Sequence, residues 1–386
     1  MRLTVFGEMV WADLSGTALR VSARVNHSLT AVPDRADASE SAPTSGRIYL
    51  FGGDDGQSPR NDCWVYDVAR DEWEEPELRG ERPSPRSRHS MTLVRHFRAE
   101  TQTEDERLYL YGGVGTHTEV VHYLDLATRT WVTPTPVGEE VLPLLGHTAA
   151  AIGAELWVFG GRDARRSYNH VWKLDTTTHE WASFRGAHAP TGMVPPPSSK
   201  HVMSVQGTKL LVVLGELPPE KVFLYETTSN AWLQAAVANP QGAPELHRGA
   251  AAFIGEELHV FGGLDVAANN PTNTMHLLDT RVMEWHTAAA GGATPTERVG
   301  HAMCALGACL FVFGGLETGG SHSASFGRYD AWALLWEVPR PDGTSPSARV
   351  GHAIASLDEQ LYVYGGASGG RPLGEVYVHN TRTSYW

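Results

Sequence analysis

The sequence predicts an all-β protein built from seven similar repeats of about fifty residues each. Eight tryptophans share one register, with successive intervals of 62, 58, 50, 51, 53, 51 and 50 residues. Short apolar runs that end in a pair of glycines recur with the same period. Such a period indicates repeats that are stacked or arranged radially, because each one is too small to bury its own apolar face. The register tryptophans are Trp11, Trp73, Trp131, Trp181, Trp232, Trp285, Trp336 and Trp386.

The Gly-pair runs predict one buried strand in each repeat. Alternating β-branched or aromatic residues that end in glycine are typical of a buried strand that stops at a tight turn. Glycine permits a positive φ and a close backbone approach at that turn. The fourth copy has lost the first glycine. The seven runs are IYLFGG at 48–53, LYLYGG at 108–113, LWVFGG at 156–161, LLVVLGE at 210–216, LHVFGG at 258–263, LFVFGG at 310–315 and LYVYGG at 361–366.

Two further positions divide each repeat into four strands. A polar residue stands six positions before each later tryptophan, where an Asp or Asn side chain can accept a hydrogen bond from the backbone two residues on. A histidine opens another apolar strand, sixteen residues after most of the tryptophans. Each repeat is therefore predicted to contain a His-led, a Gly-pair, an Asp-ended and a Trp-led strand. The turn residues are Asp67, Asp125, Asp175, Glu226, Asp279, Asp330 and Asn380, and the histidines are His27, His89, His147, His201, His301 and His352.

These features together resemble the kelch repeat. The resemblance also includes an Arg-x-x-His element that opens a repeat, which reads RVNH at 24–27, RSRH at 86–89 and RVGH at both 298–301 and 349–352. Seven copies in register cover essentially the whole chain. Local departures are Leu144 and Ser198 in place of the arginine, and LHRG at 246–249. The resemblance implies a seven-bladed β-propeller, with four-stranded kelch blades around a central channel.

The first tryptophan predicts how the ring closes. Neither a Gly pair nor a polar turn residue precedes Trp11, so it belongs to a lone Trp-type strand. We expect residues 8–15 to supply the outermost strand of blade seven, beside residues 374–380, because the first and last blades would otherwise meet without continuous pairing. Residues 1–386 are thus expected to form a single propeller domain.

Polar insertions interrupt the period inside the first two repeats. Residues 33–45 and 98–106 lengthen the turns between the first two strands of blades one and two. Both segments are short of large apolar residues and partly acidic. This composition predicts mobile loops.

Composition restricts the classes of partner. A formal net charge of −13 and the lack of a long basic run argue against a protein that wraps nucleic acid. Three cysteines are unlike the disulfide framework of a secreted domain. The sequence has no signal-peptide pattern and no run of eighteen apolar residues. We expect a soluble, cytoplasmic monomer that binds neither nucleic acid nor membrane.

The 18 histidines suggest a metal site, but six of them occupy one repeated position on different blades. Some kelch-type propellers are enzymes or cofactors of enzymes: a copper-dependent sugar oxidase, a sialic acid epimerase and iron-dependent specifier proteins. The sequence lacks the Glu-x3-Asp-x3-His spacing of the specifier iron site, and its cysteines do not support the oxidase. We expect no catalytic residue, no metal and no cofactor. The alternative is a sugar-modifying or metal-dependent enzyme at the channel mouth.

Arginines gather where the resemblance places a binding face. In kelch recognition modules, the loops after the Gly pairs and the connectors between blades form one face, on which ligands dock over the channel. The loop RDARRSYN at 162–169 is the most distinctive of these. The arginines of the Arg-x-x-His elements have an alternative role as struts between blades, paired with acids such as Asp54 or Asp55. The candidate binding residues are Arg162, Arg165, Arg166, Tyr168, Arg24, Arg86, Arg248, Arg298, Arg349 and Arg371.

An arginine-rich face on an acidic protein favours a carboxylate, an acidic peptide or a phosphorylated segment, because guanidinium groups bind such groups bidentately. The sequence therefore predicts a non-catalytic protein-interaction module or scaffold that binds an acidic or C-terminal peptide. Whether it acts as a substrate adaptor in ubiquitylation, in trafficking or on the cytoskeleton stays open, since fold alone does not fix function.

Overall fold

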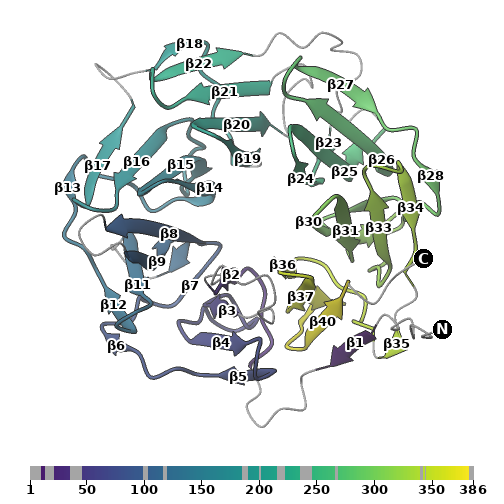
Figure 1. Cartoon of the computed structure of the whole chain (residues 1–386), viewed down its shortest axis with the longest axis horizontal. Coiled ribbons are helices and arrows are strands. Elements are labelled where there is room, and N and C mark those ends of the chain that lie inside the picture. Colours follow the sequence, from purple (N-terminus) through teal and green to yellow (C-terminus); the bar gives the residue numbers. More distant parts are fainter. Residues whose placement is uncertain are drawn as a thin grey trace, which may run out of the picture.

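The computed structural model is a ring of seven β-sheets around a central axis (Figure 1). The structure describes residues 10–13, 21–34, 46–98, 103–115, 120–184, 190–199, 201–214, 222–234, 246–265, 268–339, 342–343 and 345–381. Within these ranges all regular secondary structure is strand, and no helix occurs. The predicted all-β, seven-bladed propeller is confirmed.

Each blade has four antiparallel main strands, and the His-led strand lies nearest the axis (Figure 1). Blade 1 contains β2 (Ser28–Pro33), β3 (Gly46–Phe51), β4 (Cys63–Asp67) and β5 (Glu72–Glu74). Blade 2 contains β8 (Ser90–Arg98), β9 (Thr103–Tyr111), β11 (Val121–Asp125) and β12 (Thr130–Val132). Blade 3 contains β14 (Leu145–Ile152), β15 (Glu155–Arg162), β16 (Val171–Asp175) and β17 (Glu180–Ser183).

The remaining blades repeat this order. Blade 4 contains β19 (His201–Gln206), β20 (Lys209–Leu214), β21 (Val222–Glu226) and β22 (Ala231–Gln234). Blade 5 contains β24 (Ala250–Ile254), β25 (Glu257–Asp265), β26 (Asn270–Asp279) and β27 (Glu284–Thr287). Blade 6 contains β30 (Ala302–Leu306), β31 (Cys309–Phe313), β33 (Phe326–Asp330) and β34 (Leu335–Glu337). Blade 7 contains β36 (Ala353–Leu357), β37 (Gln360–Tyr364), β40 (Val376–Asn380) and β1 (Val10–Asp13).

The β1 strand closes the ring as predicted. It pairs antiparallel with β40, with Trp11 opposite His379 and Asp13 opposite Tyr377. The N-terminal segment thereby becomes the fourth main strand of the blade that the C-terminal segment builds (Figure 1). The described strand spans Val10–Asp13, and residues 8, 9, 14 and 15 of the predicted range lie outside the described ranges.

A short strand from the preceding connector runs parallel to the Trp-led strand in five blades. In blade 3, Gly138 pairs with Trp181. Gly138 has φ 87°, and a Cβ there would lie 2.4 Å from the carbonyl oxygen of Trp181, so glycine is required. These strands were not predicted, although a glycine seven residues after a register tryptophan marks four of the five in the sequence. They are β6 (Arg79–Gly80), β13 (Val137–Gly138), β18 (Thr191–Gly192), β28 (Gly291–Gly292) and β35 (Asp342–Gly343).

Within the described residues, five of the seven junctions between neighbouring blades contain what we call the aromatic clamp. The aromatic residue just before the Gly pair of one blade packs against both the histidine and the tryptophan of the next. In blade 2, the ring centroid of Tyr111 lies 4.7 Å from that of His147 and 5.8 Å from that of Trp181. The same clamp joins Phe51 to His89 and Trp131, Phe159 to His201 and Trp232, Phe261 to His301 and Trp336, and Tyr364 to His27 and Trp73.

The Gly pair makes room for the clamp. Gly112 and Gly113 have φ 64° and 97°. A Cβ on Gly112 would lie 2.4 Å from the carbonyl oxygen of Leu144 and 2.9 Å from Cε1 of His147, both in the next repeat. A side chain at this position would therefore push adjacent blades apart.

The clamp histidines are buried and neutral. Burial lowers the pKa of His27, His89, His301 and His352 to about 3, and repulsion from the arginine three residues earlier contributes to each. Burial also lowers the pKa of His147 and His201 to about 4. In three blades the imidazole of the clamp histidine forms a hydrogen bond with a hydroxyl group of the preceding blade, as Nε2 of His89 does with Oγ of Ser28 at 2.9 Å.

The prediction of a mobile loop at residues 98–106 is wrong for residues 98 and 103–106, which belong to strands. Arg98 ends β8 and residues 103–106 belong to β9, so the insertion extends a hairpin. The side chain of Arg95 donates to Glu106 at 2.9 Å, and Thr176 of blade 3 hydrogen bonds to His96. The polar composition therefore belongs to an ordered hairpin pinned to its neighbour. Residues 99–102, and residues 35–45 of the first predicted loop, lie outside the described residues.

We predict that Trp181→Ala lowers the free energy of unfolding by about 3–5 kcal/mol, because it removes a buried ring from the clamp between blades 2 and 3. The measurement is chemical denaturation of both proteins. Trp332→Ala is the control, since that side chain is 86% exposed and its loss should change little. A loss below about 1 kcal/mol for Trp181→Ala would contradict the role of the clamp.

Stability should fall as the pH drops from about 6.5 towards 5, below the unfolded pKa of histidine. The clamp histidines have lowered pKa values in the folded state, so the unfolded state binds more protons between pH 5 and about 6.5. The contribution of these histidines to the free energy of unfolding is therefore complete only above about pH 6.5. Urea denaturation across the window measures the proton uptake, for which we expect about one proton per clamp histidine at pH 5. A flat profile would show that these histidines are not buried.

Candidate functional site

The blade connectors and the post-Gly loops meet on one side of the ring, which we call the loop face. The amide of Gly53 in blade 1 donates to the carbonyl of Arg86 in the connector to blade 2 at 2.9 Å, and the amide of Gly315 donates to Arg349 at 2.8 Å. Short strands tie connectors to loops on this side. They are β7 (Arg86–Ser87) with β10 (Val114–Gly115), β29 (Arg298–Val299) with β32 (Leu316–Glu317), and β23 (Leu246–His247) with β25. In blade 7, β38 (Ala367–Ser368) and β39 (Arg371–Pro372) form a hairpin within the loop itself, and a bridge between Val350 and Ala367 ties that loop to the connector.

Four predicted binding residues do not line an open rim. The side chains of Arg24, Arg86, Arg298 and Arg349 are at most 3% exposed. Each one donates through a terminal guanidinium nitrogen to the carbonyl of the first glycine of its own blade's pair, at 2.9–3.2 Å. These arginines hold the connector to the Gly-pair turn. Arg24, Arg298 and Arg349 are fully buried and are withdrawn as candidate ligand contacts, whereas Arg86, 3% exposed, still reaches the wall of the cavity described below.

The partners of these arginines also differ from those predicted. Asp62 pairs with Arg24 through two 2.6 Å hydrogen bonds, and Glu375 lies 3.4 Å from Arg349. Of the expected acids, Asp55 pairs with Arg60 instead. Arg298 has only hydroxyl and carbonyl acceptors within hydrogen-bond distance in the described part of the chain, and burial lowers its pKa to about 10.

The loop of blade 3 has a rigid base. One carboxylate oxygen of Asp163 accepts from the amides of Arg165 and Arg166 at 2.7 and 2.8 Å, and the other accepts from the hydroxyl of Tyr168 at 2.7 Å. These hydrogen bonds, that from Tyr168 first, lower the pKa of Asp163 to about 2. Tyr168 is only 6% exposed and stabilises the loop through its hydrogen bond to Asp163. The prediction that it contacts a ligand at the surface is therefore withdrawn.

Three arginines of this loop project into solvent. Arg162, Arg165 and Arg166 are all exposed. The guanidinium carbon of Arg166 lies 4.8 Å from the ring centroid of Tyr168, a cation–π contact that orients it. Arg162 and Arg165 form no ion pair with any described acid. The structure therefore holds three cationic groups on one fixed turn.

Arg248 and Arg371 are also exposed on the loop face. Arg248 precedes the innermost strand of blade 5 with φ 61°, and its carbonyl accepts from the amide of Gly300 in blade 6 at 2.9 Å. Arg88 has the same position and a similar φ of 59° in blade 2. Both arginines therefore stand beside the central channel. Glycines occupy this position in RVGH, which is the sequence signal for the positive φ.

A cavity opens on the loop face between blades 2 and 3. It has a volume of about 220 Å³ and is lined by Arg86, Gly113, Pro143, Leu145, Asp163 and Ala164, among others. Asp163 and Ala164 belong to the blade 3 loop, so the exposed arginines of that loop are sequence neighbours of two lining residues. The sequence analysis identified this loop but not the connector residues that form the opposite wall.

Metal-binding clusters and membrane-spanning helices are both absent from the described ranges. No three His, Cys, Asp or Glu side chains come together there in a way that could hold a metal ion. No helix long and apolar enough to cross a membrane occurs in them.

A family model described as the KLHDC2/KLHL20/DRC7 Kelch-repeats domain matches residues 39–263 and 247–386. Acyl-CoA-binding domain-containing protein 4 of Arabidopsis thaliana is 26% identical over 272 residues, which are 66% of this chain and 40% of that protein. Rab9 effector protein with kelch motifs of Bos taurus is 27% identical over 251 residues, which are 62% and 53% of the two chains. Leucine-zipper-like transcriptional regulator 1 of Homo sapiens is 23% identical over 334 residues, or 83% and 39%.

The chain spans about half the length of these relatives or less. The Kelch-repeats family model, by contrast, matches most of this chain. From this match and the seven-bladed ring, we conclude that the chain belongs to the kelch-repeat family, whose propellers generally act as protein-interaction scaffolds.

Proposed function

We propose that this protein is a non-catalytic interaction module that binds an acidic or C-terminal peptide segment of a partner on its loop face. The observation that carries the proposal is the fixed blade 3 loop, in which Arg162, Arg165 and Arg166 are exposed and flank Asp163 and Ala164, two residues that line the 220 Å³ cavity. Arg248 and Arg371 extend the cationic area of the same face.

The chemistry of this loop favours carboxylates. Guanidinium groups donate paired hydrogen bonds to a carboxylate, and these charge-assisted bonds are stronger than neutral ones. The turn is already held by Asp163, so little conformational entropy is lost when a ligand binds. The protein as a whole carries a net charge of −13, so its field repels acids that approach away from this cluster.

The same residues support binding rather than catalysis. Asp163 is the carboxylate nearest the exposed arginines in the loop, but its oxygens accept hydrogen bonds from Tyr168 and two backbone amides. Its pKa of about 2 makes it a weak general base at neutral pH. Arginine supplies only donors, which suit recognition of an anion.

Two relatives carry names that fit an interaction role: a Rab9 effector with kelch motifs and a leucine-zipper-like transcriptional regulator. We infer a cytoplasmic monomer for this chain. The support is that Cys63, Cys304 and Cys309 are free thiols, as is usual in a reducing compartment.

The proposal predicts that reversing the charge of the turn abolishes peptide binding. Peptides selected from a random display library, with free and amidated C-termini compared, should be enriched in Asp, Glu or a free carboxylate. Arg162→Glu/Arg165→Glu/Arg166→Glu should weaken them by about tenfold or more, measured by calorimetry, because paired charge-assisted hydrogen bonds are lost.

The control is Arg70→Glu/Arg79→Glu/Arg281→Glu, which makes the same change in charge at exposed sites off the loop face. It should bind as the wild type does, and both variants should keep the wild-type melting temperature. Equal affinity of the loop variant and the wild type would overturn the proposal. Selection of no peptide, with turnover of a sugar instead, would support the enzyme alternative.

A further inference from the structure

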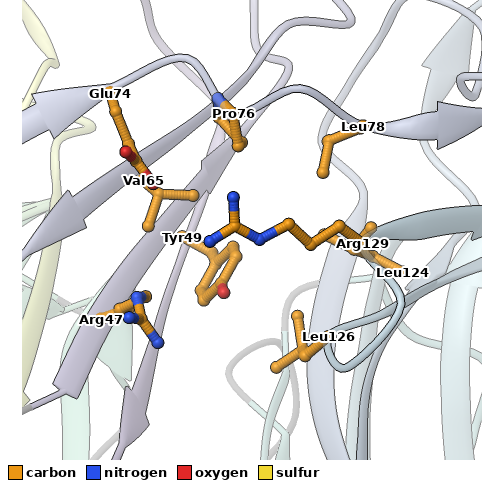
Figure 2. Close-up of a pocket in the computed structure, with 9 residues that line it drawn as sticks. All are labelled: Arg47, Tyr49, Val65, Glu74, Pro76, Leu78, Leu124, Leu126 and Arg129. Atoms are coloured by element: carbon orange, nitrogen blue, oxygen red, sulfur yellow. The ribbon is translucent and has the colours of Figure 1, made fainter.

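A second cleft lies between blades 1 and 2 on the face opposite the loop face. It has a volume of about 80 Å³. Blade 1 contributes Tyr49 of β3, Val65 of β4 and the connector residues Pro76 and Leu78, and blade 2 contributes the turn after β11 (Figure 2). The Gly pair marks the loop-face end of each blade, so this turn between β11 and β12 belongs to the other end.

Two arginines and a phenol converge in the cleft. Figure 2 shows the side chain of Arg129 extending from the blade 2 turn into the middle of the cleft, over Tyr49, while Arg47 reaches in from β3. Tyr49 is 8% exposed, and its burial raises its pKa to about 12, so it is a hydrogen-bond donor at neutral pH. The donors therefore face apolar walls of valine, proline and leucine.

The charges of the arginines are poorly neutralised within the protein. Arg47 forms a loose ion pair with Asp67, whose carboxylate oxygen lies 3.7 Å from a guanidinium nitrogen, too far for a hydrogen bond. Arg129 is exposed and has no ion pair with a described acid. Glu74 lies at the edge of the cleft. With two arginines and one glutamate, the lining carries one net positive charge.

The turn geometry does not account for Arg129. Its φ is 53°, in the left-handed region that favours Gly, Asn and Asp. Equivalent turns carry Asp71, His179 and Asn230 at φ 52–59°. The fold therefore does not require a guanidinium group at this position. The side chain of Arg129 extends into the cleft, where the apolar residues and the phenol of Tyr49 lie (Figure 2).

We propose that this cleft binds the side chain of a glutamate presented by a protein partner. The carboxylate would lie between Arg47 and Arg129 and accept a hydrogen bond from the hydroxyl of Tyr49. The methylene groups of the bound glutamate would pack against Pro76 and Leu78. The single positive charge of the lining matches one carboxylate better than a doubly charged phosphate, and the small volume suits a short aliphatic acid.

The test is an NMR titration of the full chain, with labelled tyrosine and arginine side chains. The probe is N-acetylglutamate methylamide, and its neutral comparison is the glutamine counterpart. We expect saturable shifts at Tyr49 and Arg129 with the glutamate probe only. Arg129→Gln should weaken binding by about tenfold, because a charge-assisted hydrogen bond is lost.

Arg70→Gln, an exposed arginine in the matching turn of blade 1, is the control and should leave binding unchanged. The triple arginine variant of the blade 3 loop should also respond like the wild type, because the two clefts lie on opposite faces. Equal shifts with the glutamine probe, unchanged affinity in Arg129→Gln, or tighter binding of methyl phosphate would overturn the proposal.

Discussion

The aromatic clamp is the contact on which the rest of the ring depends. A single blade cannot bury its aromatic face, and the clamp buries it against the next blade. Aromatic pairs of this kind add about 0.5–1.5 kcal/mol beyond the burial of their area. Because Tyr364 of blade 7 packs on His27 and Trp73 of blade 1, the series of clamps returns to its start. The Gly pair and the neutral histidine are both consequences of the close approach that the clamp requires.

The clamp also explains which arginines remain for function. The Gly-pair turn bends the backbone so that its carbonyl points inward, and a buried arginine of the connector satisfies it. The arginines that follow the repeat are thereby used inside the fold. The exposed ones, such as Arg162, Arg165 and Arg129, stand where the repeat does not dictate an arginine. Both proposed sites are thus built from departures from the repeat.

Periodic features could be predicted from the sequence because one physical requirement recurs seven times. The strand order, the aspartate turns, the Gly pairs and the closing role of the strand around Trp11 all follow from that register. Burial of individual polar side chains could not be predicted in this way. Arg86 and Arg88 are two residues apart, yet Arg86 is buried against the carbonyl of Gly112, whereas Arg88, at φ 59°, is exposed. Tyr168 and residues 103–106 were also misplaced, because the hydrogen bond of Tyr168 to Asp163 and the pairing of residues 103–106 with 95–98 cannot be read from the repeat.

The short parallel strands on the blade perimeter limit how a partner can approach. An open outer strand would expose backbone amides and carbonyls to which an extended peptide could add by β-augmentation. In five blades the preceding connector already occupies that position, as Gly138 does beside Trp181. Recognition at those blades therefore has to proceed through side chains on the two flat faces, and specificity can change by substitution in a turn without altering the sheets.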